Sequence, residues 1–275
     1  MTAFGERLQA ALAAAESPLC IGLDIVEERL PAVVRCEPEP VLAFARAIIE
    51  ATADLVCAYK PNLAFYERLG SRGFDLLRQI LASIPRPILT IADAKRGDIA
   101  SSAAAYAQAL FEHFGFDACT VNPYLGGEAL QPFLDRPDRG VFVLCRTSNP
   151  GAGEFQDLQV DGRPLYLVVA ERARRWNRHG NVGLVVGATY PQDLRAVRAV
   201  APDLPFLVPG VGTQGGDLTT ALVEGSDRGR APVIINVARQ VLYASAGEDF
   251  ALAARTVALQ LRETMRTTLA RVRAS

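Results

Sequence analysis

The sequence predicts an α/β protein that forms one closed barrel of eight β/α units, a single (β/α)8 TIM barrel, over residues 1–275. Three observations support this fold class. The chain has 275 residues and is 50% hydrophobic, which suits one large core, and barrels of this kind commonly have about 250 residues. Short apolar runs alternate with helix-like segments from one end of the chain to the other. No low-complexity linker or break in composition marks a second domain, although two small domains also fit the length.

Eight short apolar runs are the predicted strands. Their near-continuous apolar character is typical of parallel strands that are buried on both faces. The segments between them are long enough for crossover helices. In chain order these strands are residues 18–23, 55–59, 87–92, 118–121, 141–145, 182–186, 206–208 and 233–235.

Segments with helical periodicity lie between the strands and are expected to form the outer ring of the barrel. The last of them carries Arg255, Arg262 and Arg266 among apolar positions, which indicates a packed helix with a solvated face rather than a binding patch. The predicted helices are residues 41–52, 74–83, 101–114, 165–178, 192–200 and 249–269.

The charge and hydropathy of the chain argue against several classes of partner. A net charge of -1 and a pI near 6.2 provide no general attraction for nucleic acid or for an anionic membrane, so any anion must be bound locally. No apolar run reaches the roughly 18 residues of a membrane span. Glu6 and Arg7 interrupt the N-terminal segment early, unlike a secretory signal. We therefore expect a cytoplasmic protein.

The cysteines point to packing rather than to cross-links or metal. Five is an odd number, and no CxxC pair is present, which argues against a disulfide framework and against a structural zinc site. Cys20, Cys57, Cys119 and Cys145 all lie in predicted strands, where cysteine behaves as a small buried hydrophobe. This pattern fits a reducing compartment.

Polar residues directly after the strands are the candidate site residues, because the active sites of such barrels lie at the C-terminal ends of the strands. The chain has only two lysines against twenty-seven arginines, and both lysines fall at these ends. Lysine can transfer its proton, whereas arginine cannot. The strand-end residues are Asp24, Lys60, Asn62, Asp93, Lys95, Asp98, Arg146, Thr147 and Ser148, followed by the segments PGVGTQGGD and NVARQ.

Asp93, Lys95 and Asp98 form the strongest catalytic candidate. Asp93 and Lys95 are two residues apart, so their side chains leave a strand on the same face. Flanking carboxylates favour the charged lysine, which argues against a Schiff base and suits a proton donor that stabilises a carbanion. The alternatives are an exposed salt-bridge cluster and a magnesium site, but the ammonium would compete with magnesium for the carboxylates.

The segment from Pro209 to Asp217 is a candidate phosphate site. It has four glycines, which let backbone N–H groups approach an anion, and barrel loops after strands seven and eight often bind phosphate. Arg239 follows the eighth strand and suits bidentate phosphate contact. The segment lacks the GxxxxGK[ST] pattern, so a single phosphomonoester is the simpler ligand. The CRTSNPGAG segment around Ser148 fits a lid or a plain turn.

These motifs resemble those of the orotidine 5'-phosphate decarboxylase family, in its longer bacterial branch. The resemblance covers most of the chain and follows the family's order. It rests on IGLD around Asp24, AYKPNLAFYE around Lys60, IADAKRGDI around Lys95, TSNPGA around Ser148, LVPGVGTQGGD around Gln214 and NVARQ around Arg239.

The resemblance implies a homodimeric enzyme that removes the C6 carboxylate of orotidine 5'-phosphate, to give UMP, without metal or cofactor. Lys95 would protonate the C6 carbanion, Asp93 would lie against the substrate carboxylate, and Asp98 with Ile99 would enter the neighbouring subunit's site. The implied catalytic set is Lys95, Asp93, Asp98 and Lys60. The implied substrate-binding set is Asp24 and Lys60 at the ribose, Ser148 at the pyrimidine, Gly212, Gln214 and Arg239 at the phosphate, and Ile99, Ser102 and Asn236. Ser102 stands where the family commonly has threonine.

Two other functions fit the same motifs. The first is a magnesium-dependent sugar-phosphate lyase of the same superfamily, such as a keto-gulonate phosphate decarboxylase or a hexulose phosphate synthase. The second is a catalytically silent protein that retains a UMP pocket. Dependence of activity on magnesium would favour the first, and tight UMP binding without turnover would favour the second.

Overall fold

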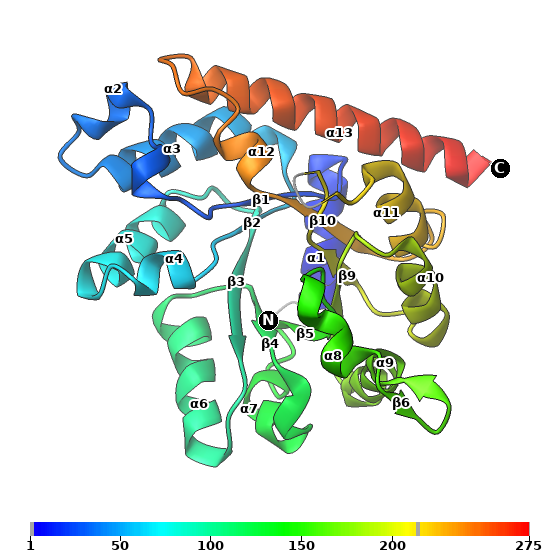
Figure 1. The fold of residues 1–275 in the computed structure, drawn as a ribbon. Helices are drawn as coiled ribbons and strands as arrows, with labels where there is room; N and C mark the ends of the chain where they lie inside the picture. The colour runs from blue at the N-terminus through cyan, green and yellow to red at the C-terminus, as the bar shows by residue number, and fades with distance from the viewer. Residues whose placement is uncertain (1–2, 213–214, 275) are drawn as a thin grey trace.

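Eight parallel strands close into a barrel at the centre of the molecule (Figure 1). The structure is a computed structural model that describes residues 3–212 and 215–274. Around the barrel the strands follow the order β1-β10-β9-β8-β5-β4-β3-β2. Their bounds are β1 Leu19–Gly22, β2 Ala58–Lys60, β3 Leu89–Arg96, β4 Ala118–Val121, β5 Gly140–Arg146, β8 Val182–Val186, β9 Phe206–Val208 and β10 Val233–Val237. The predicted (β/α)8 barrel is confirmed.

The strand ends agree with the predicted runs to within two residues, except at the start of β2 and the end of β3. Residues 53–55 form a short 3-10 turn, so β2 begins only at Ala58. In contrast, β3 continues past residue 92, where the prediction ends, to Arg96. Asp93 and Lys95 interrupt the apolar run because they line the mouth of the barrel rather than its core, and an apolar criterion stops too early at such a strand.

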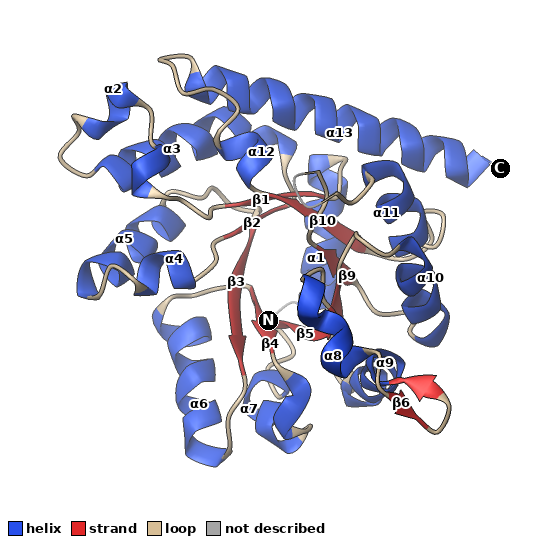
Figure 2. Ribbon diagram, viewed as in Figure 1, coloured by secondary structure: helices blue, strands red, loops and turns tan. Residues whose placement is uncertain are grey.

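Helices form a ring around the strands, as Figure 2 shows in blue around red. All six predicted helices are present: α3 Pro40–Thr52, α5 Ser71–Ala82, α6 Ala100–Gln108 with a π-helical continuation Ala109–His113, α9 Leu165–Trp176, α10 Pro191–Val200 and α13 Phe250–Ala274. Two longer helices were not predicted, α1 Phe4–Ala15 and α11 Leu218–Gly225. Within the described part of the chain, no helix has the length and apolar character needed to cross a membrane.

Short elements fill the connections between strands and helices. The helical ones are η1 Glu27–Arg29, α2 Ala32–Arg35, η2 Ala53–Leu55, α4 Ala64–Glu67, η4 Pro123–Leu125, η5 Glu128–Leu130, α7 Gln131–Leu134, η6 Pro150–Ala152, α8 Gly153–Gln156 and α12 Arg239–Leu242. A two-stranded antiparallel hairpin, β6 Gln159–Val160 with β7 Arg163–Pro164, follows α8.

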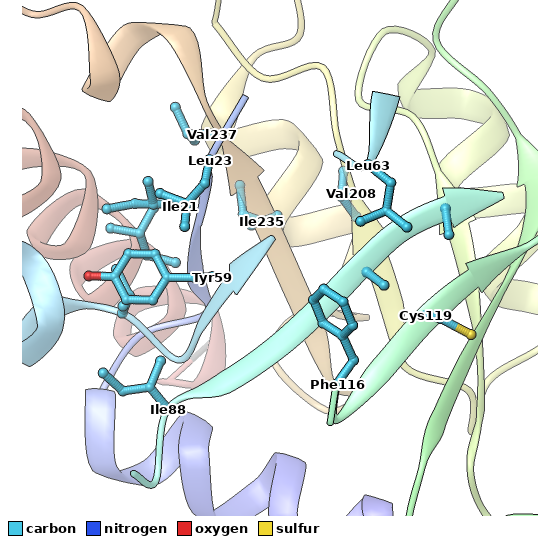
Figure 3. Packing of buried hydrophobic residues seen from close by; sticks show 14 of the residues in the cluster. Ile21, Leu23, Tyr59, Leu63, Ile88, Phe116, Cys119, Val208, Ile235 and Val237 are labelled. Atoms are coloured by element: carbon cyan, nitrogen blue, oxygen red, sulfur yellow. The ribbon is translucent and has the colours of Figure 1, made fainter. Parts of the chain in front are cut away.

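Side chains of the strands alternate between two packing layers. On β1, Leu19 and Ile21 pack outward with the helices, whereas Cys20 faces the barrel interior. Figure 3 shows part of the outer layer, with Ile21 and Tyr59 from neighbouring strands packed together. The four cysteines predicted to be core residues are buried. This alternation also decides which residues near the strand ends point into the mouth.

Helix α1 closes the barrel at the N-terminal ends of the strands. Its buried residues Phe4 and Leu8 belong to the same apolar cluster as the interior residues of the strands. The Phe4 ring makes an edge contact with Phe142 at a centroid distance of 6.2 Å. It also lies against Gly140, where an added Cβ would be 2.3 Å from a ring carbon. Glycine at this position therefore gives the helix room to insert.

Candidate active site

A cavity of about 790 Å³ lies at the C-terminal ends of the barrel strands. It brings together side chains that are far apart in the sequence, and it lies where the fold predicts the site. The predicted residues that line it are Asp24, Lys60, Asn62, Asp93, Lys95, Thr147, Ser148, Asn236 and Arg239.

Asp93 links the two lysines of the chain. The Lys60 Nζ lies 2.7 Å from Asp93 Oδ2, and the Lys95 Nζ lies 2.5 Å from Asp93 Oδ1. The Lys60 side chain is only 4% exposed, whereas that of Lys95 is 48% exposed at the open side of the cavity. The buried ammonium of Lys60 is thus held in place, whereas the exposed ammonium of Lys95 is accessible to a bound molecule.

Thr120, at the end of β4, organises this cluster and was not predicted. Its hydroxyl accepts hydrogen bonds from the backbone N–H groups of Ala94 (3.0 Å) and Lys95 (2.9 Å), and donates one to Asp93 Oδ1 (3.1 Å). These bonds use the full capacity of a hydroxyl group. Thr120 sits in an apolar run and faces inward by strand alternation, and that alternation is the signal that could have identified it.

The backbone of Lys95 adopts a conformation that side chains seldom adopt. Its φ is +50°, and the pairing of β3 with β4 shifts register between Ala92 and Arg96. A left-handed conformation costs roughly 1–2 kcal/mol outside glycine. The two N–H bonds to Thr120 help to offset that cost. Strain of this kind is concentrated at functional sites.

The charges of the cluster shift the pKa values of its members in opposite directions. Burial alone would raise the pKa of Asp93, but the charges of Lys60 and Lys95 together outweigh it and lower that pKa below the usual range. Burial would lower the pKa of Lys60, but Asp93 and Asp24 raise it above its ordinary value. Both Asp93 and Lys60 are therefore charged at neutral pH.

Asp24 has an unsatisfied acceptor beside this cluster. Among the described residues, no group donates a hydrogen bond to its buried Oδ1 atom. Burial raises the pKa of Asp24, and the charge of Lys60 offsets this only in part. A buried acceptor without a donor at the wall of a cavity suits a ligand hydroxyl.

The glycine-rich loop and the start of α12 form another wall of the cavity. Pro209, Gly210 and Val211 line it together with the exposed Arg239. Gly212 does not line it, and Gln214 lies outside the described residues. Arg29, which was not predicted, also lines the cavity, with its guanidinium 3.8 Å from the centre of the Tyr243 ring. Two arginines thus provide positive charge for an anion.

Ser148 lies in the segment between β5 and α8, on the rim of the same cavity. Ser148 packs closely against Gly187, since a Cβ added to Gly187 would lie only 2.9 Å from the backbone N of Ser148.

The strand-end residue Arg146 turns away from the cavity, where β5 shifts register against β8. Its Nε donates a hydrogen bond to Asp193 Oδ2 at 2.8 Å. It is a structural residue rather than part of the cavity wall.

Asp98, Ile99 and Ser102 do not line the cavity of this chain. They lie around the start of α6, and Ile99 is 56% exposed. Tyr124 and Leu125, which follow β4, are also exposed apolar residues. These residues provide apolar surface beside the barrel mouth.

No group of three or more His, Cys, Asp or Glu side chains in the described ranges is arranged to hold a metal ion. Lys60 forms an ion pair with Asp93, and its charge also acts on Asp24. The two carboxylates of the cavity therefore already have a cation beside them. Chemically, the site offers a proton-bearing ammonium, a largely buried carboxylate and a wall that carries two arginines.

The chain is similar to known proteins over nearly its full length. The sequence profile described as the orotidine 5'-phosphate decarboxylase / HUMPS family matches residues 17–254. The orotidine 5'-phosphate decarboxylase of Thermomicrobium roseum is 58% identical over 265 residues, which covers 95% of this chain and 94% of that protein. That of a Roseiflexus species is 54% identical over 253 residues, which covers 91% and 93%.

Solved structures agree with these sequence relatives. The OMP decarboxylase of Leishmania donovani superimposes with a TM-score of 0.82 at 39% identity, covering 97% of this chain and all of that one (100%). The UMP synthase of the same organism gives a TM-score of 0.85 at 41% identity, with 97% of this chain and 57% of that chain covered.

Proposed function

Because this chain belongs to the orotidine 5'-phosphate decarboxylase / HUMPS family, we propose that it converts orotidine 5'-phosphate to UMP and CO2 in the cavity described above. The chain is a carboxy-lyase, and this reaction is the last step of UMP synthesis. The observation that carries the proposal is the pair of lysines held by Asp93 at the mouth of the barrel.

Lys95 is the proton donor in this proposal. The bond between C6 and the carboxylate carbon breaks, CO2 leaves, and the electron pair remains on C6. The Lys95 ammonium stabilises that negative charge and transfers its proton to C6, and water then restores the proton to the lysine. Its exposure to the cavity and its 2.5 Å contact with Asp93 support this role. Asp93 acts beside the substrate carboxylate, and Lys60 holds Asp93.

The remaining residues bind the two ends of the substrate. Asp24 and Lys60 take the ribose hydroxyls, which is supported by the unsatisfied Oδ1 of Asp24. Ser148 contacts the pyrimidine, and Asn236 and Ser102 are further substrate-binding residues. Gly212, Gln214 and Arg239 bind the phosphate. Binding energy at this remote phosphate contributes to orientation at the reacting carbon.

The active unit in this proposal is a homodimer in the cytoplasm, with residues 1–275 as one barrel domain. Asp98 and Ile99 cross to the partner subunit's site. The exposed apolar side chains of Ile99, Tyr124 and Leu125 beside the mouth support an interface there. The cysteines of the described chain are free thiols, which suits a reducing compartment.

The direct test is to add orotidine 5'-phosphate to purified, EDTA-treated protein and to follow its ultraviolet absorbance. Loss of the orotate chromophore with formation of UMP is expected. Activity that vanishes with EDTA and returns with magnesium would instead favour the magnesium-dependent lyase. Tight UMP binding without turnover would favour the silent binding protein.

Two variants test the proton donor. Lys95→Ala and Lys95→Arg should both lose decarboxylation while retaining UMP binding, and the second keeps the positive charge without a transferable proton. Near-normal turnover in Lys95→Ala would refute any catalytic role of Lys95. Near-normal turnover in Lys95→Arg alone would show that charge, and not proton transfer, is what the reaction needs.

A further inference from the structure

Gln156 ties the loop around Ser148 back onto the end of β5. Its side-chain Oε1 accepts a hydrogen bond from the Thr147 backbone N–H at 2.9 Å, and its Nε2 donates one to Thr147 Oγ1 at 2.7 Å. Thr147 Oγ1 in turn donates to Asn149 Oδ1 at 2.6 Å. The amide thereby closes a loop of ten residues, 147–156. Thr147, Ser148, Asn149 and Gln156 all line the catalytic cavity.

An ion pair joins the residues that flank this loop on either side. Arg146 directly precedes Thr147, and Asp157 directly follows Gln156. The Nη1 atom of Arg146 lies 3.1 Å from Asp157 Oδ1, and its Nε donates to Asp193 Oδ2 at 2.8 Å. The Arg146 side chain is buried, so the outer end of the loop is attached to a rigid part of the barrel.

Ser148 is therefore restricted from two sides. On one side its backbone packs against Gly187, whose own N–H donates to the Arg146 carbonyl at 2.7 Å. On the other side the residue before it is held through both its backbone N–H and its hydroxyl by Gln156. A cavity-lining residue held in this way needs little ordering when a ligand binds, which lowers the entropic cost of binding.

We propose that Gln156 is a positioning residue that pre-orders Ser148 for the pyrimidine end of the substrate. This inference rests on the proposed function and extends it to a residue that acts through Thr147 rather than through the reacting atoms. The interaction is made before the substrate binds, so its loss weakens binding of the substrate and of the transition state by similar amounts. Its effect is then expected in KM rather than in kcat.

The test compares Gln156→Ala with Gln159→Ala, a glutamine of the neighbouring hairpin that is exposed and whose side chain donates to the Asp157 carbonyl. We expect Gln156→Ala to raise KM for orotidine 5'-phosphate and Kd for UMP in parallel, by roughly tenfold, because the loop must then be ordered when the ligand binds. Its kcat should stay close to that of Gln159→Ala, and its unfolding temperature should fall by only a few degrees. A general structural role would instead lower kcat and the unfolding temperature together.

Changes at Thr147 complete the test. Thr147→Ser keeps the hydroxyl and should raise KM less than Thr147→Val, which removes it. In the Gln156→Ala background, Thr147→Val should raise KM by less than it does in the wild-type background, because both changes remove the bond between Gln156 Nε2 and Thr147 Oγ1.

Equal KM values for Gln156→Ala and Gln159→Ala, or fully additive effects of Gln156→Ala and Thr147→Val, would overturn the inference. If the wild-type protein binds UMP but does not turn over the substrate, the proposed reaction fails. The UMP affinities of these variants still decide the role of Gln156 in that case.

Discussion

Replacing Thr120 by valine removes one hydroxyl and nearly nothing else, and it should damage both stability and catalysis. The hydroxyl is the acceptor for the N–H groups of Ala94 and Lys95. The bond to Ala94 is buried, and loss of its acceptor costs about 1–3 kcal/mol. The bond to Lys95 is partly solvated and is worth about 1 kcal/mol. We therefore expect a loss of about 2–4 kcal/mol in the free energy of unfolding.

Thermal unfolding followed by circular dichroism measures this loss. For a chain of this size, 1 kcal/mol corresponds to about 2–4 °C, so the Tm of Thr120→Val should fall by roughly 5–15 °C. Its kcat should fall roughly tenfold, because Asp93 loses a hydrogen bond and Lys95 loses the support of its left-handed backbone. Thr120→Ser keeps the hydroxyl and is the matched control. A Thr120→Val protein with the Tm and kcat of Thr120→Ser would refute the reasoning.

Three further predictions concern other parts of the site. Arg239→Ala should raise KM strongly and lower kcat in steady-state assays, because phosphate binding energy also orients the reacting end, and no change in either would remove Arg239 from the site. The pKa of Asp93 is lowered on folding, so its stabilising effect is present above the usual value of 3.8 and is lost as pH falls through the lowered pKa. The Tm of Asp93→Asn should thus lie below that of wild type at pH 7, with a gap that narrows below about pH 4; a gap independent of pH would contradict this. Ile99→Asp should shift the protein to monomers in sedimentation experiments and abolish turnover, whereas Leu252→Asp, at an exposed position on α13, should do neither; an active, dimeric Ile99→Asp protein would contradict the crossing of Ile99.

The barrel could be predicted because its strands are buried on both faces and so leave continuous apolar runs. The prediction was wrong at the end of β3, where Asp93 and Lys95 interrupt the apolar run although the strand continues. It missed α1, although Phe4, Leu8, Ala11 and Ala15 repeat with helical spacing. The role of α1 in closing the barrel could not be predicted, because the surface that this helix covers is made by residues of many different strands.

The candidate site could be predicted where polar residues directly follow a strand. Asp24, Lys60 and Lys95 were identified in this way, and the structure brings them to one cavity. Thr120 escaped because threonine fits an apolar strand equally well. Arg146 was predicted as a site residue because it follows a strand, but it does not line the cavity, and the strand shifts register at this residue. Register shifts depend on the pairing between strands and cannot be recognised in a single amino-acid sequence.

The position of α1 has a consequence for how the chain is made. This helix precedes every barrel strand along the chain, yet the surface that receives Phe4 and Leu8 includes Leu207 of β9 and Ile234 of β10. The receiving surface is therefore complete only when most of the chain has been synthesised. Until then the apolar face of the helix lacks its final partner, so α1 docks late although it is translated early. Deletion of α1 should accordingly leave the strands able to form but their interior open to water at one end.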